Sequence, residues 1–388
     1  MRPDDTPIEA TSAQETEVRG GTAGAHAATG TPDESALVVH EESPLNAETR
    51  ASALVGRPVT PTEAFYVRSH GPVPTRGDDA PIRVGGLVEH PLDLSACELV
   101  ERFEVHEVTA TVQCAGNRRS GFLGVRDIPG ETPWGPGATG TATWRGVRLR
   151  DVLAAVAPTA GAAHVEFTGA DVSEQADPPQ EFGGSIPLSK AWGEEVLLAV
   201  EMNGDPLTPE HGAPVRVVVP GYVGARSVKW VTRIDVRAQP SENFFQAHSY
   251  RLLPADAGPD EAGPGDGIPL GPVALNCDVL DPEPGAVVDA GPLEVRGYAY
   301  AGGDRVVARV DVSVDDGTTW AQAELLGDAD PWTWRLWRCT VPVEVGKVTI
   351  LARAWDDTGA LQPEHAASLW NPKGYANNSW ARLPVRVR

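Results

Sequence analysis

Residues Val108 to Ser120 read Val-Thr-Ala-Thr-Val-Gln-Cys-Ala-Gly-Asn-Arg-Arg-Ser, an alternating apolar run followed by a short turn. The apolar residues recur at every second position up to Cys114, which is the period of a strand with one buried face. We therefore expect a strand that ends at Cys114, with the thiol directed toward the buried face. Gly116 lets the backbone pass close to the sulfur. Arg118 and Arg119 follow at once, and their permanent charge is expected to favour the thiolate, a soft metal ligand.

The residues of this run leave two interpretations of Cys114 open. A single cysteine at the end of a strand is more often a small buried hydrophobe than a reactive group. The four cysteines of the chain are widely spaced and fit neither a disulfide framework nor a zinc site: Cys97, Cys114, Cys277 and Cys339. We expect reduced thiols.

Length and composition exclude several classes of protein. A chain of 388 residues can form two or three domains that each bury a core. Its formal net charge of −22 argues against nucleic-acid binding, which requires a basic surface. The sequence has no apolar run long enough for a membrane helix and no apolar signal core after Met1. We expect a cytoplasmic protein with no membrane partner.

The pattern changes along the chain predict four segments. Residues 1–35 are predicted to form a disordered acidic tail. Residues 36–254 mix apolar runs with turn clusters and one Leu- and Ala-rich stretch, which is typical of an α+β domain. Residues 255–272 are rich in Pro and Gly and predict a linker, and residues 273–388 alternate as in an all-β immunoglobulin-like sandwich. The runs predicted as strands are 82–88, 108–114, 215–219 and 228–236, and the predicted helix is 150–156.

The run from Thr111 to Ser120 resembles the molybdenum-cofactor signature of the sulfite oxidase family. The cysteine of that signature binds the metal, so the resemblance implies a molybdenum and molybdopterin cofactor with Cys114 as the metal ligand. The resemblance runs from near Pro58 to the C-terminus. It implies a mixed α+β molybdopterin domain followed by an immunoglobulin-like dimerisation domain, and hence a homodimer. This division agrees with the one predicted from the pattern alone.

Further segments resemble the cofactor-binding stretches of the family. The family holds the phosphate end of the pterin at the positions of His211 and Arg216. Side chains five residues apart on a regular strand point to opposite faces, so a bend at Pro214 must bring these two together. A phosphate requires an arginine fork, a lysine charge and backbone donors. The residues that the resemblance implies for the cofactor are Tyr66, Val67, Arg68, Ser69, His70, Asp171, His211, Arg216, Ser227, Val228 and Lys229.

The resemblance also implies catalytic and substrate-binding residues, namely Tyr250, Arg68, Arg119, Trp134 and Lys373. Tyr250 matches the active-site tyrosine, whose hydroxyl hydrogen bonds without adding charge. Lys373 departs from the pattern, because sulfite-oxidising relatives in animals and plants carry an arginine there. A lysine keeps the charge but loses the bidentate fork, which leaves the affinity and even the choice of oxyanion open.

The implied activity is oxidation of the small oxyanion sulfite to sulfate by oxygen-atom transfer at molybdenum. The sequence has no Cys-x-x-Cys-His haem motif and no His-Pro-Gly-Gly motif, so electrons are expected to pass to an external acceptor, a cytochrome or another carrier. Two alternatives stay open. One is a molybdenum oxidoreductase of the nitrate reductase type or for another oxyanion, and the other is a non-catalytic dimeric binding module of the same fold.

Overall fold

The computed structural model describes residues 36–258 and 262–388. The predicted acidic tail at 1–35 lies outside the described residues. None of the helices in these two ranges is long and apolar enough to cross a membrane. The cytoplasmic location stays a prediction.

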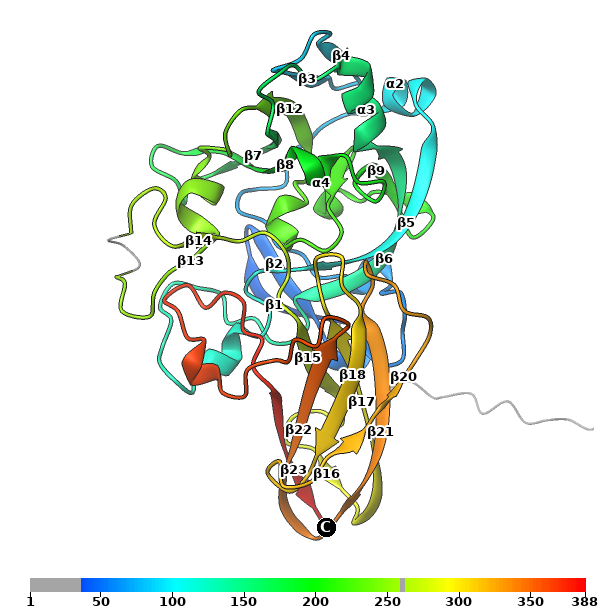
Figure 1. Cartoon of the computed structure of the whole chain (residues 1–388), viewed down its shortest axis with the longest axis vertical. Coiled ribbons are helices and arrows are strands. Elements are labelled where there is room, and N and C mark those ends of the chain that lie inside the picture. The colour runs from blue at the N-terminus through cyan, green and yellow to red at the C-terminus, as the bar shows by residue number, and fades with distance from the viewer. Residues whose placement is uncertain (1–35, 259–261) are drawn as a thin grey trace, which may run out of the picture. The chain divides into compact units, whose positions relative to one another are not determined.

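Residues 37–237 form three sheets with short helices between them (Figure 1). A two-stranded sheet pairs β1 (Leu37–Glu42) with β2 (Leu45–Thr49). The second sheet has the order β10-β9-β6-β5, and β11 also pairs with β9; its strands are β5 (Val105–Gln113), β6 (Thr139–Arg148), β9 (Leu197–Met202), β10 (Asp205–Pro206) and β11 (Arg216–Val218). The third has the order β4-β3-β12-β7-β8; its strands are β3 (Ile82–Gly86), β4 (Leu92–Leu94), β7 (His164–Ser173), β8 (Gln180–Pro187) and β12 (Val231–Arg237).

The α-helices of this region are short: α1 (Ala51–Leu54), α2 (Ala96–Arg102), α3 (Leu149–Val156) and α4 (Leu188–Ala191). A capping box starts α2, because Ser95 and Glu98 each accept the other's backbone N–H. The predicted helix at 150–156 is confirmed as α3, whose buried residues recur at intervals of three and four. Single turns of 3-10 or π helix lie at Thr62–Ala64, Arg119–Phe122, Pro209–His211, Gly224–Arg226, Phe245–Ser249 and Ala366–Ser368. The α+β prediction is confirmed.

β5 confirms the strand predicted before Cys114. Ala110, Val112 and Cys114 all belong to one hydrophobic cluster, as their shared parity predicts. Thr111 has the opposite parity, and its Oγ accepts the backbone N–H of Trp334 at 2.8 Å. The end of this strand is therefore buried on both faces, one by its own domain and the other by the C-terminal domain.

The strand predicted at 228–236 is wrong at its first three residues, because β12 begins at Val231. Trp230 has a φ of +51°, in the left-handed region, which interrupts the extended backbone. Ser227 and Lys229 therefore lie in a loop before the strand, where their side chains reach a pocket instead of the sheet.

Residues 276–387 form two further sheets, drawn from yellow to red in Figure 1. The first has the order β15-β17-β21-β20; its strands are β15 (Asn276–Asp281), β17 (Gly291–Tyr300), β20 (Glu324–Leu325) and β21 (Arg335–Val343). The second has the order β16-β23-β22-β18-β19; its strands are β16 (Val287–Val288), β18 (Val307–Ser313), β19 (Ala321–Gln322), β22 (Gly346–Asp356) and β23 (Ala381–Val387). Alternate residues of the two sheets share one hydrophobic cluster, which confirms the predicted sandwich.

The segment 255–272, predicted as a linker, returns to the first domain. β13 (Arg251–Leu252) pairs with β14 (Ile268–Pro269) in antiparallel fashion. The guanidinium of Arg251 donates to the carbonyls of Gly265 and Gly267 at 2.6 and 2.8 Å. The part of this segment from Gly265 to Pro269 is therefore attached to the strand that precedes it.

The turn after Cys114 is anchored to the C-terminal sandwich. Arg118 adopts a φ of +65°, and its Nε lies 2.5 Å from a carboxylate oxygen of Asp278. The same guanidinium donates to the carbonyl of Ser379 at 2.8 Å, while the amide of Asn117 donates to the Tyr298 hydroxyl at 3.0 Å. The conformation of the turn therefore depends on the folding of both domains.

We expect Arg118→Ala to lower the free energy of unfolding by about 3 kcal/mol, because it leaves the Asp278 carboxylate largely buried without its cation. Denaturant unfolding measures this loss. The control is Arg338→Ala, which breaks the exposed pair with Glu324 and should have a much smaller effect, because solvent screens that pair. Equal losses in the two variants would contradict the anchoring role of Arg118.

Candidate active site

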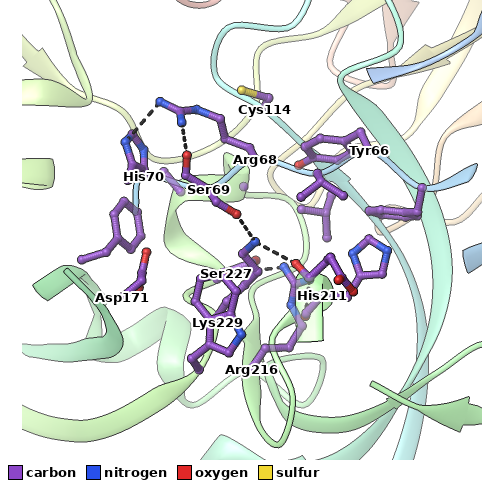
Figure 2. A pocket seen from close by; sticks show the side chains of 18 of the residues that line it. Tyr66, Arg68, Ser69, His70, Cys114, Asp171, His211, Arg216, Ser227 and Lys229 are labelled. Atoms are coloured by element: carbon purple, nitrogen blue, oxygen red, sulfur yellow. Dashed lines mark hydrogen bonds between the residues drawn. The ribbon is translucent and has the colours of Figure 1, made fainter. Parts of the chain in front are cut away.

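A buried pocket in the first domain collects most of the residues that the sequence implied for a cofactor. Figure 2 shows Cys114 at one end of this pocket and Arg216 and Lys229 toward the other. The predicted residues that line it are Tyr66, Val67, Arg68, Ser69, His70, Cys114, Asp171, His211, Arg216, Ser227, Lys229 and Tyr250. Val228 does not line it, because its side chain packs into the hydrophobic core.

Cys114 lies directly after the last residue of β5, where the chain turns beneath the sulfur. The backbone N–H of Gly116 donates to Sγ at 3.4 Å. A Cβ at Gly116 would lie 2.8 Å from the Arg119 guanidinium and 2.9 Å from the Trp134 ring, so this approach requires glycine. The thiol is buried and within reach of the pocket.

The predicted thiolate of Cys114 is corrected by the structure. Burial raises the pKa of the Cys114 thiol, and the charges of Arg119 and Arg68 oppose this rise only in part. Arg118 contributes little, because it points to Asp278 in the other domain. The protein by itself therefore holds a neutral thiol, and a bound metal cation would be needed to favour the thiolate.

Arg68 lies at the centre of the pocket and is held by its neighbours. Its Nη1 donates to the amide oxygen of Asn46 at 3.2 Å. Figure 2 shows its bonds to the carbonyl of Ser69 and, from Nη2, to Nδ1 of His70 at 3.1 Å. Asn46 also accepts the backbone N–H of Ser69. The guanidinium is thus oriented before any ligand binds.

His70 connects this segment with Tyr250. Its Nε2 lies 2.7 Å from the Tyr250 hydroxyl, and its ring packs against both Phe182 and Phe245. Burial, with a further contribution from Arg68, holds the pKa of His70 well below its usual range, so the imidazole is neutral. Burial also raises the pKa of Tyr250 to about 12, which keeps its phenol protonated at neutral pH. The phenol can therefore donate a hydrogen bond in the pocket.

The opposite end of the pocket brings His211, Arg216 and Lys229 together, as predicted. Gly212, with a φ of +105°, turns the chain between the first two, and a Cβ there would lie 2.9 Å from Lys229 Cβ. Arg216 donates to the carbonyls of His211 at 3.0 Å and Ser227 at 3.3 Å. Lys229 Nζ donates to Ser69 Oγ at 2.9 Å. Segments far apart in the sequence thus meet at this end.

Arg216 and Lys229 bring a buried excess of positive charge to this end of the pocket. Burial, followed by the charges of Arg216 and Arg68, lowers the pKa of Lys229 to about 7. Burial lowers the pKa of Arg216 to about 10, and burial with the neighbouring cations lowers that of His211 to about 3. Cations held this closely without water require an anion to neutralise them. The charge at this end of the pocket therefore favours an anionic group such as a phosphate.

Two buried polar atoms in the pocket lack hydrogen-bond partners, Oδ1 of Asp171 and Nε of Arg216. Burial raises the pKa of Asp171 to about 7, against the opposing effect of Lys229. Buried polar atoms are nearly always paired in folded proteins. Their arrangement therefore indicates a ligand that both accepts and donates hydrogen bonds.

Three predicted residues do not line this pocket, namely Arg119, Trp134 and Lys373. They lie beside the turn that follows Cys114. Trp134 is buried and makes an edge-to-face contact with His40 at 5.1 Å. Arg119 Nε donates to the backbone carbonyl of Lys373 at 3.0 Å. The guanidinium of Arg119 also contributes to the electrostatics of both Cys114 and Tyr250, which places it in the same region of the protein.

Sequence reasoning missed several residues that shape the site: Asn46, Glu131, Gln175, Phe182, Phe245 and Tyr375. Tyr375 stacks on Tyr250 with ring centroids 5.4 Å apart, and Arg119 lies 5.3 Å above its ring. Its place two residues after Lys373 could have indicated it. Asn46 and Phe182 carry no local signal, since each lies in an ordinary strand pattern and reaches the pocket only through the fold.

Two protein families match the chain. The oxidoreductase molybdopterin binding domain matches residues 70–245, and the Mo-co oxidoreductase dimerisation domain matches residues 272–388. The sulfite oxidase of Gallus gallus is 42% identical over 362 residues, which cover 90% of this chain and 78% of that protein. The chain belongs to the sulfite oxidase family. The sulfite oxidase of Arabidopsis thaliana is 37% identical over 383 residues, covering 92% of this chain and 95% of that protein.

Membership of the sulfite oxidase family confirms the family that the run around Cys114 predicted. The molybdopterin-binding and dimerisation domains follow one another in the predicted order. Among solved structures, the sulfane dehydrogenase SoxCD of Paracoccus pantotrophus superposes with a TM-score of 0.77 at 26% identity, covering 95% of this chain and 93% of that one. The fold therefore extends across both domains.

This sulfite oxidase family protein, prepared without cofactor, can be compared with its variant Lys229→Gln. We expect the free energy of unfolding of the wild type to increase from pH 7 to pH 9 relative to that of the variant. The folded protein releases the Lys229 proton near pH 7, while the unfolded chain keeps it to about pH 10.4. The unfolded state then binds more protons in this window, so stability rises with pH, by about 1–2 kcal/mol here. Denaturant unfolding of both proteins at the two pH values measures the difference. The exposed lysine variant Lys347→Gln is the control and should follow the wild type.

Proposed function

We propose that this chain oxidises sulfite to sulfate by oxygen-atom transfer at a molybdenum–molybdopterin centre and passes the electrons to a separate acceptor. The observation that carries the proposal is one pocket with a buried cysteine sulfur at one end and a buried cation cluster at the other. Similarity to sulfite oxidases over about nine tenths of the chain supports the choice of substrate.

The residues of the pocket fit such a cofactor. Arg216, Lys229 and the groups around them would take its phosphate, which supplies the negative charge that this end of the pocket lacks. The unpartnered carboxylate oxygen of Asp171 would accept a pterin N–H. Cys114 would bind the molybdenum through its sulfur. When bound, the group supplies a metal that transfers an oxygen atom and accepts two electrons.

The side chains around Cys114 would attract and orient the substrate. Arg68 and Arg119 provide permanent positive charge in a largely buried region, while the rest of this acidic chain repels a dianion. The Tyr250 phenol keeps its proton and can donate it in a hydrogen bond to a bound oxyanion. His70 fixes the orientation of that phenol through its Nε2. Lys373 adds a third, more exposed cation.

The test of this function is sulfite-dependent reduction of ferricyanide, with metal analysis of the wild type beside Cys114→Ser. We expect the wild type to contain molybdenum and to turn over sulfite. The variant should lose at least about a hundredfold in activity, because its hydroxyl is a poor ligand for a metal that favours sulfur. It should keep its fold and much of its pterin, since the phosphate end has its own anchors.

The outcome that would defeat the proposal is a fully metal-loaded wild type without sulfite activity. Nitrate reduction with a viologen dye is the matched assay, because it distinguishes sulfite oxidation from the nitrate reductase alternative. An active Cys114→Ser variant would refute the ligand assignment alone.

We propose that the protein is a homodimer formed through residues 272–388. The support is the match of this segment to the Mo-co oxidoreductase dimerisation domain. Sedimentation at micromolar concentration should give twice the mass of the chain. A monomer at that concentration would contradict this part of the proposal and leave the activity untouched.

A further inference from the structure

The carboxylate of Glu131 lies beside cations that the proposed reaction requires for binding its substrate. Glu131 Oε2 lies 3.2 Å from Arg119 Nη2, and its Oε1 lies 3.4 Å from Lys373 Nζ. One glutamate therefore bridges two of the three cations expected to hold the substrate. The side chain of Arg119 is only 3% exposed, whereas those of Glu131 and Lys373 are 21% and 26% exposed.

The guanidinium of Arg119 has every nitrogen already engaged. Nε donates to the carbonyl of Lys373 at 3.0 Å, and Nη1 donates to the carbonyl of Thr132 at 2.8 Å. Its remaining nitrogen, Nη2, pairs with Glu131. Gly374 and the ring of Tyr375 pack against the same side chain and prevent it from moving aside. An oxyanion that approaches Arg119 must therefore share or replace the carboxylate of Glu131.

Glu131 also acts on the centre of the site. Its negative charge contributes to raising the pKa of Tyr250, and thus opposes the effect of Arg119 on that phenol. The carboxylate is close enough to reduce the positive potential that a dianion would meet. It is also more exposed than Arg119, so it can turn toward solvent while the arginine stays fixed.

We propose that Glu131 sets the affinity of the site for oxyanions, as an internal counter-anion that competes with the oxyanion substrate and product for Arg119 and Lys373. The inference rests on the proposed function, which supplies the anion. With substrate absent, the carboxylate pairs with both cations and offsets part of their charge. With substrate bound, the dianion takes over at least one of these contacts. Glu131 thereby weakens the binding of both sulfite and sulfate, which favours release of the product.

The test uses the holoenzyme and two substitutions at one position. Glu131→Gln removes the charge but keeps the shape and one acceptor oxygen, so we expect the KM for sulfite and the inhibition constant of sulfate to fall about fivefold. Glu131→Asp keeps the charge and should stay near the wild type. Glu324→Gln, which neutralises an exposed arginine pair in the C-terminal sandwich, is the matched control and should change neither constant.

A second measurement separates this inference from the proposed function. Sulfate stabilises a protein that binds it, so thermal unfolding of each holoenzyme is followed against sulfate concentration, with Glu324→Gln reporting general salt effects. Half-maximal stabilisation at lower sulfate in Glu131→Gln supports the inference even if sulfite is not turned over. Equal or weaker sulfate binding in Glu131→Gln overturns it and leaves Glu131 as a residue that only positions Arg119. Absence of sulfite turnover in every protein counts against the proposed function alone.

Discussion

Arg118 and Arg119, in the turn after Cys114, bind different partners, and the geometry of the site depends on both contacts. Arg118, in a left-handed conformation, forms a buried ion pair with Asp278 of the sandwich. Arg119 then points back to the region of Cys114 and Tyr250. A buried charge needs its partner in place, so the ion pair fixes the backbone between the two domains. The sulfur keeps its position because the turn that follows it is held from both sides.

The second constraint is the balance of charge in an acidic protein. The chain carries a formal net charge of −22, yet its pocket gathers Arg68, Arg216 and Lys229 away from water. Distant carboxylates are screened by solvent and salt over about 10 Å, whereas the buried cations act on one another at close range. The pocket therefore favours an anion although the surface repels one. Close to Arg119, the negative charge of Glu131 reduces this positive potential.

The sequence predicted the positions of residues well where a local motif decides them. Cys114 was located by the parity of its strand and by the turn that follows, and His211 and Arg216 were expected to converge through a bend. The sequence-based prediction failed where the surroundings of a group decide its protonation state. The thiolate expected at Cys114 does not form in the protein alone, because burial outweighs the adjacent arginines. No spacing of residues could have predicted the neutral thiol, because the burial of Cys114 depends on segments from both domains.

The sequence by itself determined the order of the two domains and the alternation that buries their strands, since both follow from local pattern. It also named the residues proposed to hold a cofactor, and most of them line one pocket. Only the tertiary structure decided how these residues act together. It sent Arg118 to Asp278 and Arg119 to Glu131, placed His70 against Tyr250, and set Val228 in the core between two pocket residues. Distances and burial between distant segments set electrostatic energies, and these are absent from any single stretch of sequence.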